Sequence, residues 1–402
     1  MRTGNLVDLQ DHNLSRILEL LRENGGISRQ DLVEMTGLSA SGVSKLVGEL
    51  IDKGLVVEDT IISRNKGRRA ISLKLNPNSV HAVGVRLARH SVQCGLFNVY
   101  GRALFTTTRD FRTRSLAEAK STLEELIGET LEESKARSLK VVGIGVSAPG
   151  PMFSHEGRIV LTSNYPEWTG FSVKEFLASR FDMPVYVEHD ANVSVLAEKW
   201  FGKGVGSNNL VYVMVDRGVG AGIFYDGKLY RGNHGIAGEI GHTTICYDGP
   251  PCECGNRGCL EMYCSSFAVL TQAREVLAAE TAPDGQLTID VIARMAREGD
   301  PRALQLVTEA GRFLGIGIAN LINAYNPERI ILGGEMSKAG EPWFRAVKES
   351  VRQRTLPEVY SGTEIHLSEL ETDPAFLGTG SLVISAAFEN VSELQTHDVT
   401  GK

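Results

Sequence analysis

The chain has 402 residues, of which 42% are hydrophobic and 23% are charged, and its formal net charge is −7. This length excludes a single small core and predicts two or three domains of ordinary globular composition. The lack of an apolar run of membrane-spanning length and the polar N-terminus argue against membrane insertion and against a signal peptide. Three of the six cysteines have metal-binding spacing, so we expect a reducing compartment, the cytoplasm.

The N-terminal segment predicts three short helices. Residues 12–23 repeat Leu and Ile at helical spacing, and two glycines follow them. Ser28 and Asp31 have the spacing of a capping box before a second helix, and Ser39 begins a third. Because Gly37 permits a sharp turn between the last two helices, this segment is typical of a helix-turn-helix.

The third helix and the hairpin after it predict a winged helix that binds double-stranded DNA. Small or polar side chains on the outward face of the helix suit a major groove, so we expect DNA contacts from Ser39, Ala40, Ser41, Ser44 and Lys45. The hairpin tip is basic and could reach phosphate or a minor groove through Arg64, Lys66, Arg68 and Arg69. Taken alone, this tip could equally be a solvated surface loop.

The charge distribution is compatible with DNA binding although the whole chain is acidic. Residues 1–76 have a net charge of +1, and residues 77–402 have a net charge of −8. A near-neutral module with a local basic cluster can still dock on phosphate. We therefore expect a cytoplasmic protein that is associated with the nucleoid when it is bound to operator DNA.

After a short linker at residues 76–78, the pattern changes to strands that alternate with helices. Glycine-rich turns at the strand ends predict two α/β lobes around a cleft. A last apolar helix is expected between Gly378–Gly380 and Phe388, followed by a polar, frayed tail from Asn390. The other elements expected are strands at 81–87, 91–97, 141–146, 185–187, 211–215 and 329–332, helices at 115–136 and 303–325, and a helix that follows residues 188–192 and runs through Trp200.

One imidazole and three thiols, those of His242, Cys252, Cys254 and Cys259, fall within eighteen residues. This is the ligand set of a closed, tetrahedral Cys3His site, so we expect one structural Zn²⁺ per chain. A disulfide beside an unrelated histidine is the alternative. A zinc-pinned loop would hold Glu239 and Glu261, whose carboxylates could accept hydrogen bonds from sugar hydroxyls, although both could be solvated loop residues.

The runs Gly238–His242 (GEIGH) and Cys252–Glu261 (CECGNRGCLE) resemble the signature of the ROK family, which contains repressors, open reading frames and kinases. The resemblance extends over nearly the whole chain. The winged helix is similar to that of the repressor branch, which includes N-acetylglucosamine, glucose-responsive and xylose repressors. The resemblance implies an α/β fold in which the winged helix precedes a two-lobed actin-like or sugar-kinase-like (ribonuclease H-like) ROK domain with a structural zinc loop.

The resemblance also implies site residues. It assigns the zinc ligands to His242, Cys252, Cys254 and Cys259, and it implies effector contacts from Asn164, Asp190, Asn192, Glu239, His242 and Glu261. Asp190 stands where the family kinases have their catalytic base, and His189 replaces an Asn that is common in the kinases. Inherited scaffolding that no longer meets a sugar is the alternative.

The phosphate-binding loops of the family kinases are altered in this chain. The pattern Asp-x-Gly-Gly-Thr is replaced at Arg86, Ala88, Arg89 and His90, and Gly-Thr-Gly is replaced by residues 216–218, Asp-Arg-Gly. Without an acid for the metal and clearance for the phosphates, phosphoryl transfer is not expected, and no residue is predicted to be catalytic. The arginines could instead bind the phosphate of a sugar phosphate, unless they are merely exposed.

We therefore expect a transcriptional repressor of genes for carbohydrate uptake or catabolism, relieved allosterically by a sugar or sugar phosphate. A homodimer or tetramer would place two winged helices on a pseudo-palindromic operator. Relief by a phosphotransferase-system protein and a sugar kinase with an accessory DNA-binding head are the alternatives. The expected domains are 1–76, the winged helix; 77–192 plus 376–402, the first lobe; and 193–375, the second lobe with the zinc loop and dimerisation surface.

Overall fold

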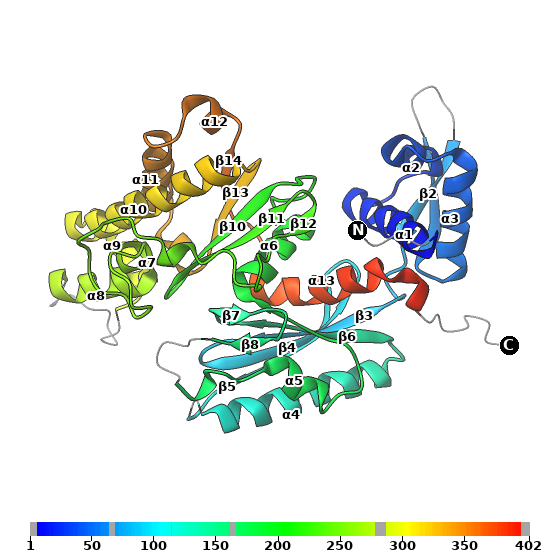
Figure 1. Ribbon diagram of the computed structural model, residues 1–402, viewed down its shortest axis with the longest axis horizontal. Coiled ribbons are helices and arrows are strands. Elements are labelled where there is room, and N and C mark those ends of the chain that lie inside the picture. The colour runs from blue at the N-terminus through cyan, green and yellow to red at the C-terminus, as the bar shows by residue number, and fades with distance from the viewer. Residues whose placement is uncertain (1–5, 64–68, 114, 161–165, 278–286, 395–402) are drawn as a thin grey trace.

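The computed structural model describes residues 6–63, 69–113, 115–160, 166–277 and 287–394. The protein consists of an N-terminal head, two α/β lobes and a pair of helices between the lobes (Figure 1). Within these ranges no helix has the length and apolar character needed to cross a membrane.

The head is a winged helix. Its three helices pack around aliphatic side chains, and an antiparallel hairpin closes one side of this core. A bridge between Ile27 and Leu73 adds the segment before the second helix to the hairpin. The elements are α1 (Leu6–Asn24), α2 (Arg29–Thr36), α3 (Ala40–Asp52), β1 (Val56–Ser63) and β2 (Arg69–Leu75).

The local helix signals in the head are confirmed. Ser28 and Asp31 form a reciprocal capping box at the start of α2. Ser39 caps α3 by accepting a hydrogen bond from a backbone N–H of the first turn at 3.1 Å. The apolar stripe of α3 is buried, whereas Met35 of α2 is 44% exposed. In this two-turn helix only Leu32 is buried in the core.

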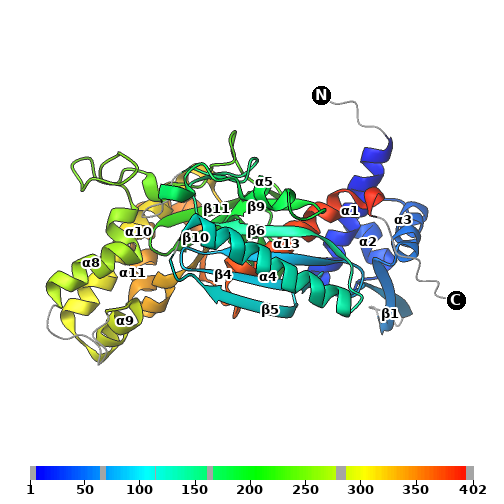
Figure 2. The ribbon, with the colours of Figure 1, turned by 90° about the horizontal axis from the view of Figure 1, so that it is seen from below.

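The first lobe is a five-stranded sheet in the order β5-β4-β3-β6-β9. Strands β3, β6 and β9 are parallel, while β4 and β5 are antiparallel additions. Helix α4 covers one face of the sheet, as the view in Figure 2 shows, and α13 covers the other. The elements are β3 (His81–Leu87), β4 (Ser91–Asn98), β5 (Ala103–Asp110), α4 (Leu116–Ala136), β6 (Val141–Ala148), β7 (Met152–Phe153), β8 (Arg158–Ile159), η1 (Pro166–Trp168), α5 (Val173–Ala178), β9 (Val185–His189) and α13 (Pro374–Glu389).

The second lobe is a five-stranded sheet in the order β12-β11-β10-β13-β14. Helix α6 covers the face toward the first lobe, and the remaining helices pack on the opposite side (Figure 1). The elements are α6 (Asp190–Phe201), β10 (Leu210–Val215), β11 (Val219–Tyr225), β12 (Lys228–Leu229), η2 (Ile240–His242), α7 (Glu261–Cys264), α8 (Ser266–Val276), α9 (Ile289–Glu298), α10 (Pro301–Tyr325), β13 (Arg329–Gly333), η3 (Glu335–Ala339), α11 (Glu341–Arg352), α12 (Pro357–Ser361) and β14 (Glu364–Leu367).

Helices α6 and α13 cross between the two sheets at very short range. A Cβ atom added at Gly378 of α13 would lie only 2.0 Å from the carbonyl oxygen of Val193 of α6. The prediction that Gly378 and Gly380 precede the last helix is therefore wrong. Both glycines lie inside α13, which begins at Pro374 with Asp373 as its N-cap. The crossing leaves no room for a side chain at Gly378, and Phe97 of β4 leaves none at Gly380.

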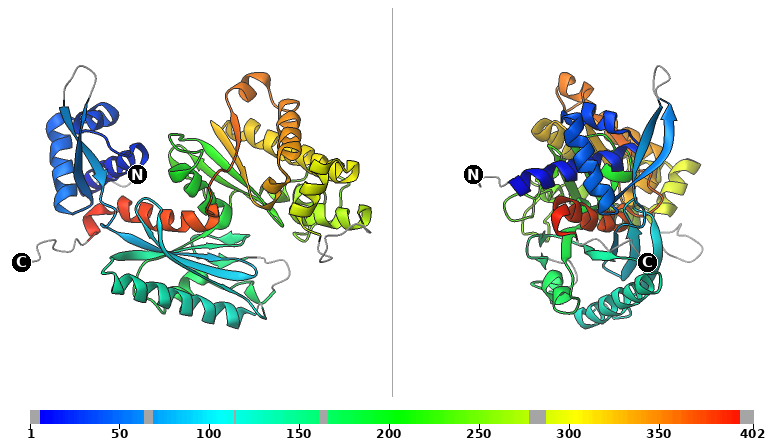
Figure 3. Two further views of the ribbon diagram at one scale, coloured as in Figure 1. Left: turned by 180° about the vertical axis from the view of Figure 1, so that it is seen from behind. Right: turned by 90° about the vertical axis from the view of Figure 1, so that its right-hand side faces the viewer.

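The head does not have a core separate from the first lobe. One continuous apolar cluster joins α1–α3 to Val80 and Ala82 of the first lobe and to Phe388 of α13. Figure 3 shows the head resting at one end of α13. The prediction of a frayed tail from Asn390 is wrong for the first residues of that tail, since η4 (Val391–Glu393) follows α13 and the side chain of Val391 is fully buried in this cluster.

Candidate functional site

A cavity of about 290 Å³ lies between the lobes, where the carboxyl ends of their parallel strands face each other. Such an edge is where open α/β sheets bind ligands. Four loops supply most of the wall: the β3–β4 turn, the end of β6, the β9–α6 junction and the β10–β11 turn. The other lining residues are Glu239, His242, Glu253, Cys254, Glu261 and Glu335.

Four of the six predicted effector residues line this cavity: Asp190, Glu239, His242 and Glu261. They come from three separate segments, and His242 Nδ1 lies 3.3 Å from Glu261 Oε1. Burial raises the pKa of Glu239, and His189 and His242 partly offset this shift. Three carboxyl groups and an imidazole make a wall rich in hydrogen-bond acceptors, which suits a ligand with several hydroxyl donors.

Of the two predicted asparagines, only Asn192 can be placed, and it does not line the cavity. Asn164 lies outside the described residues. Asn192 is two residues after Asp190 on α6, is 1% exposed, and donates from Nδ2 to Glu188 Oε2 at 3.0 Å. The other oxygen of Glu188 pairs with Arg231. Asn192 therefore supports the wall from behind.

The cavity wall also contains polar side chains that the sequence did not single out as effector contacts, among them His189 and Ser147. His189 caps α6 and accepts a hydrogen bond at Nδ1 from the N–H of Ala191 at 3.3 Å, and its Nε2 lies 3.2 Å from Asp190 Oδ1. Its position next to Asp190 in the chain was the available signal. Ser147 is fully buried, and its hydroxyl has no partner among the described residues. Nothing in the sequence marked this serine.

The end of the cavity that corresponds to the kinase phosphate loops contains both signs of charge. Arg86 forms an ion pair with Asp373, the N-cap of α13. Asp216 accepts a hydrogen bond from the backbone of Glu335, and burial raises its pKa to about 6. Arg89 lines this end too, and it has no ion pair within the described ranges. An incoming phosphate would meet cations here, but also a buried carboxyl group.

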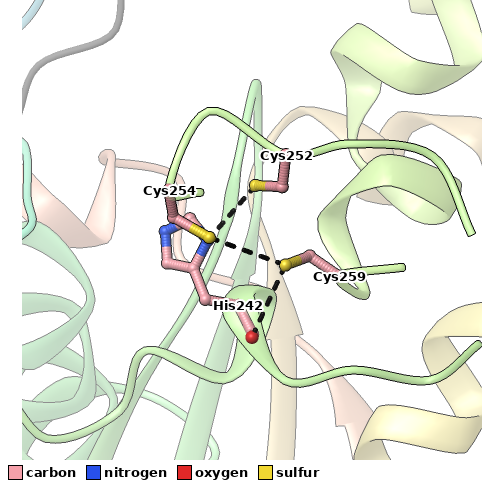
Figure 4. A group of neighbouring side chains, drawn as sticks. All are labelled: His242, Cys252, Cys254 and Cys259. Carbon is pink, nitrogen blue, oxygen red and sulfur yellow. Dashed lines mark hydrogen bonds between the residues drawn. The ribbon is translucent and has the colours of Figure 1, made fainter. Parts of the chain in front are cut away.

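The four predicted metal ligands lie close together in the fold. One ligand atom from each of His242, Cys252, Cys254 and Cys259 lies within 4.8 Å of the others (Figure 4). The sulfurs of Cys254 and Cys259 are 3.7 Å apart, and Cys252 Sγ is 3.6 Å from His242 Nδ1. Tetrahedral zinc with Zn–S bonds of about 2.3 Å requires sulfurs about 3.8 Å apart. These distances fit a bound metal ion. The disulfide alternative is wrong, because Cys252, Cys254 and Cys259 are all free thiols.

The predicted DNA-contacting face of α3 is on the surface. Ser39, Ala40, Ser41, Ser44 and Lys45 are all exposed. The Ser39 hydroxyl lies 3.2 Å from the Ser41 hydroxyl, so the two share one polar corner at the start of the helix. Of the predicted wing residues, Arg69 begins β2, while Arg64, Lys66 and Arg68 lie outside the described residues.

Residues 82–386 match the ROK family, and residues 10–57 match the winged helix-turn-helix DNA-binding family. The chain belongs to the ROK family. Its ROK domain contains both lobes and the metal-ligand group, and the second match covers the three helices of the head.

Two curated relatives match the ROK chain over nearly their whole length. A xylose repressor of Caldicellulosiruptor bescii is 32% identical over 394 residues, which cover 95% of this chain and 98% of the relative. The N-acetylglucosamine repressor of Escherichia coli is 29% identical over 391 residues, which cover 96% of each chain. Both names describe sugar-related repressors.

Solved structures of a ROK regulator and of a ROK kinase cover different shares of this chain. A ROK family transcriptional regulator, a homologue of the E. coli Mlc protein, is 29% identical with a TM-score of 0.80, covering 95% of this chain and 97% of its own. A ROK hexokinase from Thermus thermophilus is 28% identical with a TM-score of 0.64, covering 97% of its own chain but 75% of this one. The hexokinase thus accounts for the lobes and leaves a quarter of this chain unmatched.

Proposed function

We propose that this protein is a DNA-binding transcriptional repressor of genes for carbohydrate uptake or catabolism, and that a sugar or sugar phosphate in the interlobe cavity relieves the repression. The observation that carries the proposal is the union of two sites in one chain. An exposed, polar recognition helix lies in the head, and a cavity lined by Asp190, Glu239, His242 and Glu261 lies in the ROK domain. The relatives named as repressors align with this chain across both parts.

The effector is held by the acceptor-rich wall. Asp190, Glu239 and Glu261 accept hydrogen bonds from sugar hydroxyls, and Asn164 and Asn192 complete the predicted set. Asn192 acts through Glu188 in the structure described, because its amide faces that carboxylate. A phosphate on the effector would lie toward Arg86, Arg89 and Arg217, where the family kinases hold their nucleotide.

A single structural Zn²⁺ would be bound by His242, Cys252, Cys254 and Cys259. The 3.6 Å distance from Cys252 Sγ to His242 Nδ1 supports Nδ1 as the coordinating atom, which would leave Nε2 for the effector. With four protein ligands the ion keeps no open position, so it stiffens the loop and supplies no reactive water. The loop then fixes Glu239 and Glu261 at its two ends.

The chain acts as a regulator rather than as a kinase. A kinase needs an acid for its metal and open loops for the triphosphate. Here Arg86 takes the place of that acid and is neutralised by Asp373, while Asp216 brings a carboxyl group to the second loop. Asp190 persists as the remnant of the catalytic base, and it now serves ligand binding.

The DNA-bound form would be a homodimer or tetramer in the cytoplasm, with two heads on a pseudo-palindromic operator. Ser39, Ala40, Ser41, Ser44 and Lys45 approach the bases and phosphates of the major groove, and the wing residues Arg64, Lys66, Arg68 and Arg69 reach the backbone. We divide the chain into the winged helix at 1–76, the first lobe at 77–192 plus 376–402, and the second lobe at 193–375. The second lobe supplies the dimerisation surface.

The proposal is tested with purified protein and a duplex selected by that protein from a random-sequence pool. Operator affinity is measured with and without D-xylose, D-glucose, N-acetyl-D-glucosamine and the 6-phosphates of the two hexoses. One of these compounds should raise the melting temperature and weaken the operator complex, since an effector stabilises the state it binds. Selection of no duplex, or ATP-dependent phosphorylation of a sugar at enzymic rates, would overturn the proposal. If a phosphotransferase-system protein releases the operator and no sugar does, that protein is the effector in place of a sugar.

A further inference from the structure

Arg22, near the end of α1, connects the DNA-binding head to both helices of the interlobe pair. Its side chain is buried, with 6% exposed. Its terminal nitrogens donate to the hydroxyls of Ser381 at 3.1 Å and Ser385 at 3.4 Å, both on α13. On its other side, the guanidinium carbon lies 4.4 Å from the ring centroid of Trp200, on α6. One side chain of the head thus contacts α6 and α13 at once.

The next residue strengthens the contact with α6. Glu23 forms an ion pair with Lys199, whose side chain is only 4% exposed. Breaking a buried ion pair leaves an uncompensated charge, so this pair holds the end of α1 firmly against α6. Arg22 has no such carboxylate contact within the described ranges, and its Nε has no hydrogen-bond partner there. The Arg22 contact is therefore the weaker of the two and the one that a small movement can change.

Helices α6 and α13 are each seated on a different lobe. A Cβ atom at Gly222 of β11 would lie 2.1 Å from the carbonyl oxygen of Ala191, so the backbone of α6 rests directly on the second-lobe sheet. A Cβ atom at Gly145 of β6 would lie 2.2 Å from the carbonyl oxygen of Thr379, so α13 rests directly on the first-lobe sheet. Phe201 of α6 also packs against Gly101 of the first lobe, and Leu382 of α13 belongs to an apolar cluster with Tyr212 of β10. The close backbone contact of each helix is nevertheless with one sheet, so each helix follows mainly that sheet.

The crossing point makes this pair a pivot. Gly378 and Val193 meet backbone to backbone, so the helices can rotate there but cannot approach further. Trp200 lies seven residues beyond Val193, about 10 Å along α6. Ser381 lies beyond the crossing on α13. Helix shifts of about 1–2 Å are usual in allosteric proteins and are enough to break a hydrogen bond of this length.

The opposite ends of the same two helices meet the cavity. His189 and Asp190 begin α6 and line it, and Asp373, which begins α13, pairs with the lining residue Arg86. A ligand at the cavity therefore acts on the starts of both helices, while Arg22 contacts them beyond the crossing. Together these contacts form a continuous path from the cavity to α1.

We propose that Arg22 is a positioning residue that couples cavity occupancy to DNA binding, by responding to the angle between α6 and α13 and moving the head accordingly. This inference rests on the proposed function, since it specifies how that cavity regulates operator affinity. The head is joined to α13 by the shared apolar cluster and to α6 by the Glu23–Lys199 pair. Arg22 therefore keeps its contacts with both helices only at the interhelical angle of this structure, and a different angle would break one of them.

The test compares wild type with Arg22→Met, which keeps much of the length and apolar surface of the side chain but removes its charge and donors. The full-length protein, the selected duplex and the sugar panel above are used, and operator affinity and sugar affinity are measured separately. In the wild type, saturating sugar should weaken operator binding by about 5–150-fold, the usual range of allosteric coupling. In Arg22→Met the ratio should fall below about 2-fold while sugar affinity stays within about 3-fold of wild type. Arg22→Lys, which keeps the charge, should restore part of the ratio.

Arg16→Met is the matched control, because Arg16 is on the same helix but is exposed, and within the described ranges its one ion pair is with the half-buried Glu19. It should keep the full sugar response. Should Arg22→Met fail to fold, Ser381→Ala removes an acceptor on α13 and should also lower the ratio. An unchanged ratio in the folded variants overturns the inference. So does loss of sugar-free operator binding at an unchanged melting temperature, which would show that Arg22 only holds the head. Absence of any sugar response in the wild type overturns the proposed function itself.

Discussion

Replacement of Asp216 by Asn should stabilise the protein in a pH-dependent way. Asp216 stands at the end of β10, against the wall of the interlobe cavity. Burial raises its pKa from 3.8 to about 6; the backbone N–H of Glu335 and the charge of Arg86 lower it, and Asp190 and Asp373 raise it further. An amide at this position keeps the acceptor for the backbone N–H of Glu335 but carries no charge.

The magnitude follows from linkage. A pKa raised by about two units disfavours the ionised carboxyl by about 3 kcal/mol, since each unit is worth about 1.4 kcal/mol. The sign is that of an acid with a raised folded-state pKa: the penalty is absent below about pH 4, grows as the pH rises, and is complete above about pH 6. Asp216→Asn should therefore gain about 1–3 kcal/mol over wild type at about pH 8 and almost nothing at about pH 4.

Denaturant unfolding of both proteins across this pH range measures the difference directly, and the other titrating groups cancel in the comparison. Asp290→Asn is the matched control, because Asp290 forms an exposed pair with Lys338. It should change stability by less than about 0.5 kcal/mol. A pH-independent difference between wild type and Asp216→Asn, or a loss of stability at about pH 8, would refute the reasoning.

Three further predictions concern the metal, the helix crossing and the recognition helix. Cys254→Ala should lose bound zinc, measured by metal analysis of the purified protein, whereas Cys246→Ser should keep it; full zinc in the first variant would disprove the ligand assignment. Gly378→Ala should destabilise the protein by about 1–3 kcal/mol, because its Cβ would lie 2.0 Å from a carbonyl oxygen of α6. Gly128→Ala, in open space on α4, should instead stabilise it by about 0.5–1 kcal/mol, and thermal unfolding that ranks the two the other way would contradict the packing argument. Lys45→Ala should weaken operator binding and reduce the slope of log affinity against log salt by about 1; an unchanged slope would remove Lys45 from the phosphate contacts.

Part of the candidate site could be predicted because its residues are close in the chain. His242, Cys252, Cys254 and Cys259 lie on one loop, so their spacing alone indicated a metal site. The two acids that flank the loop were predicted for the same reason. Ser147 could not be predicted, because a serine on an apolar strand has no local pattern that distinguishes it. It enters the cavity only because β6 ends at the edge where the two sheets face each other.

The last helix shows where prediction from local pattern fails. Glycines at 378 and 380 favour a turn by their backbone freedom, so the helix was predicted to start after them. In the structure they serve packing, since α13 crosses α6 and lies against the first sheet at distances that exclude a Cβ atom. The buried Val391 is a similar case, because the α1–α3 cluster that covers it is formed by residues more than three hundred positions away.

The sequence by itself determined the winged helix, the alternation of strands and helices and the grouping of four candidate metal ligands on one loop, because capping, periodicity and ligand spacing depend on neighbouring residues. Only the tertiary structure decided that α6 and α13 are seated on different lobes, that Asp216 is enclosed and that Arg22 contacts both helices. These features depend on distances between segments far apart in the chain. Such distances are set by how whole sheets pack, and no single stretch of residues contains that information.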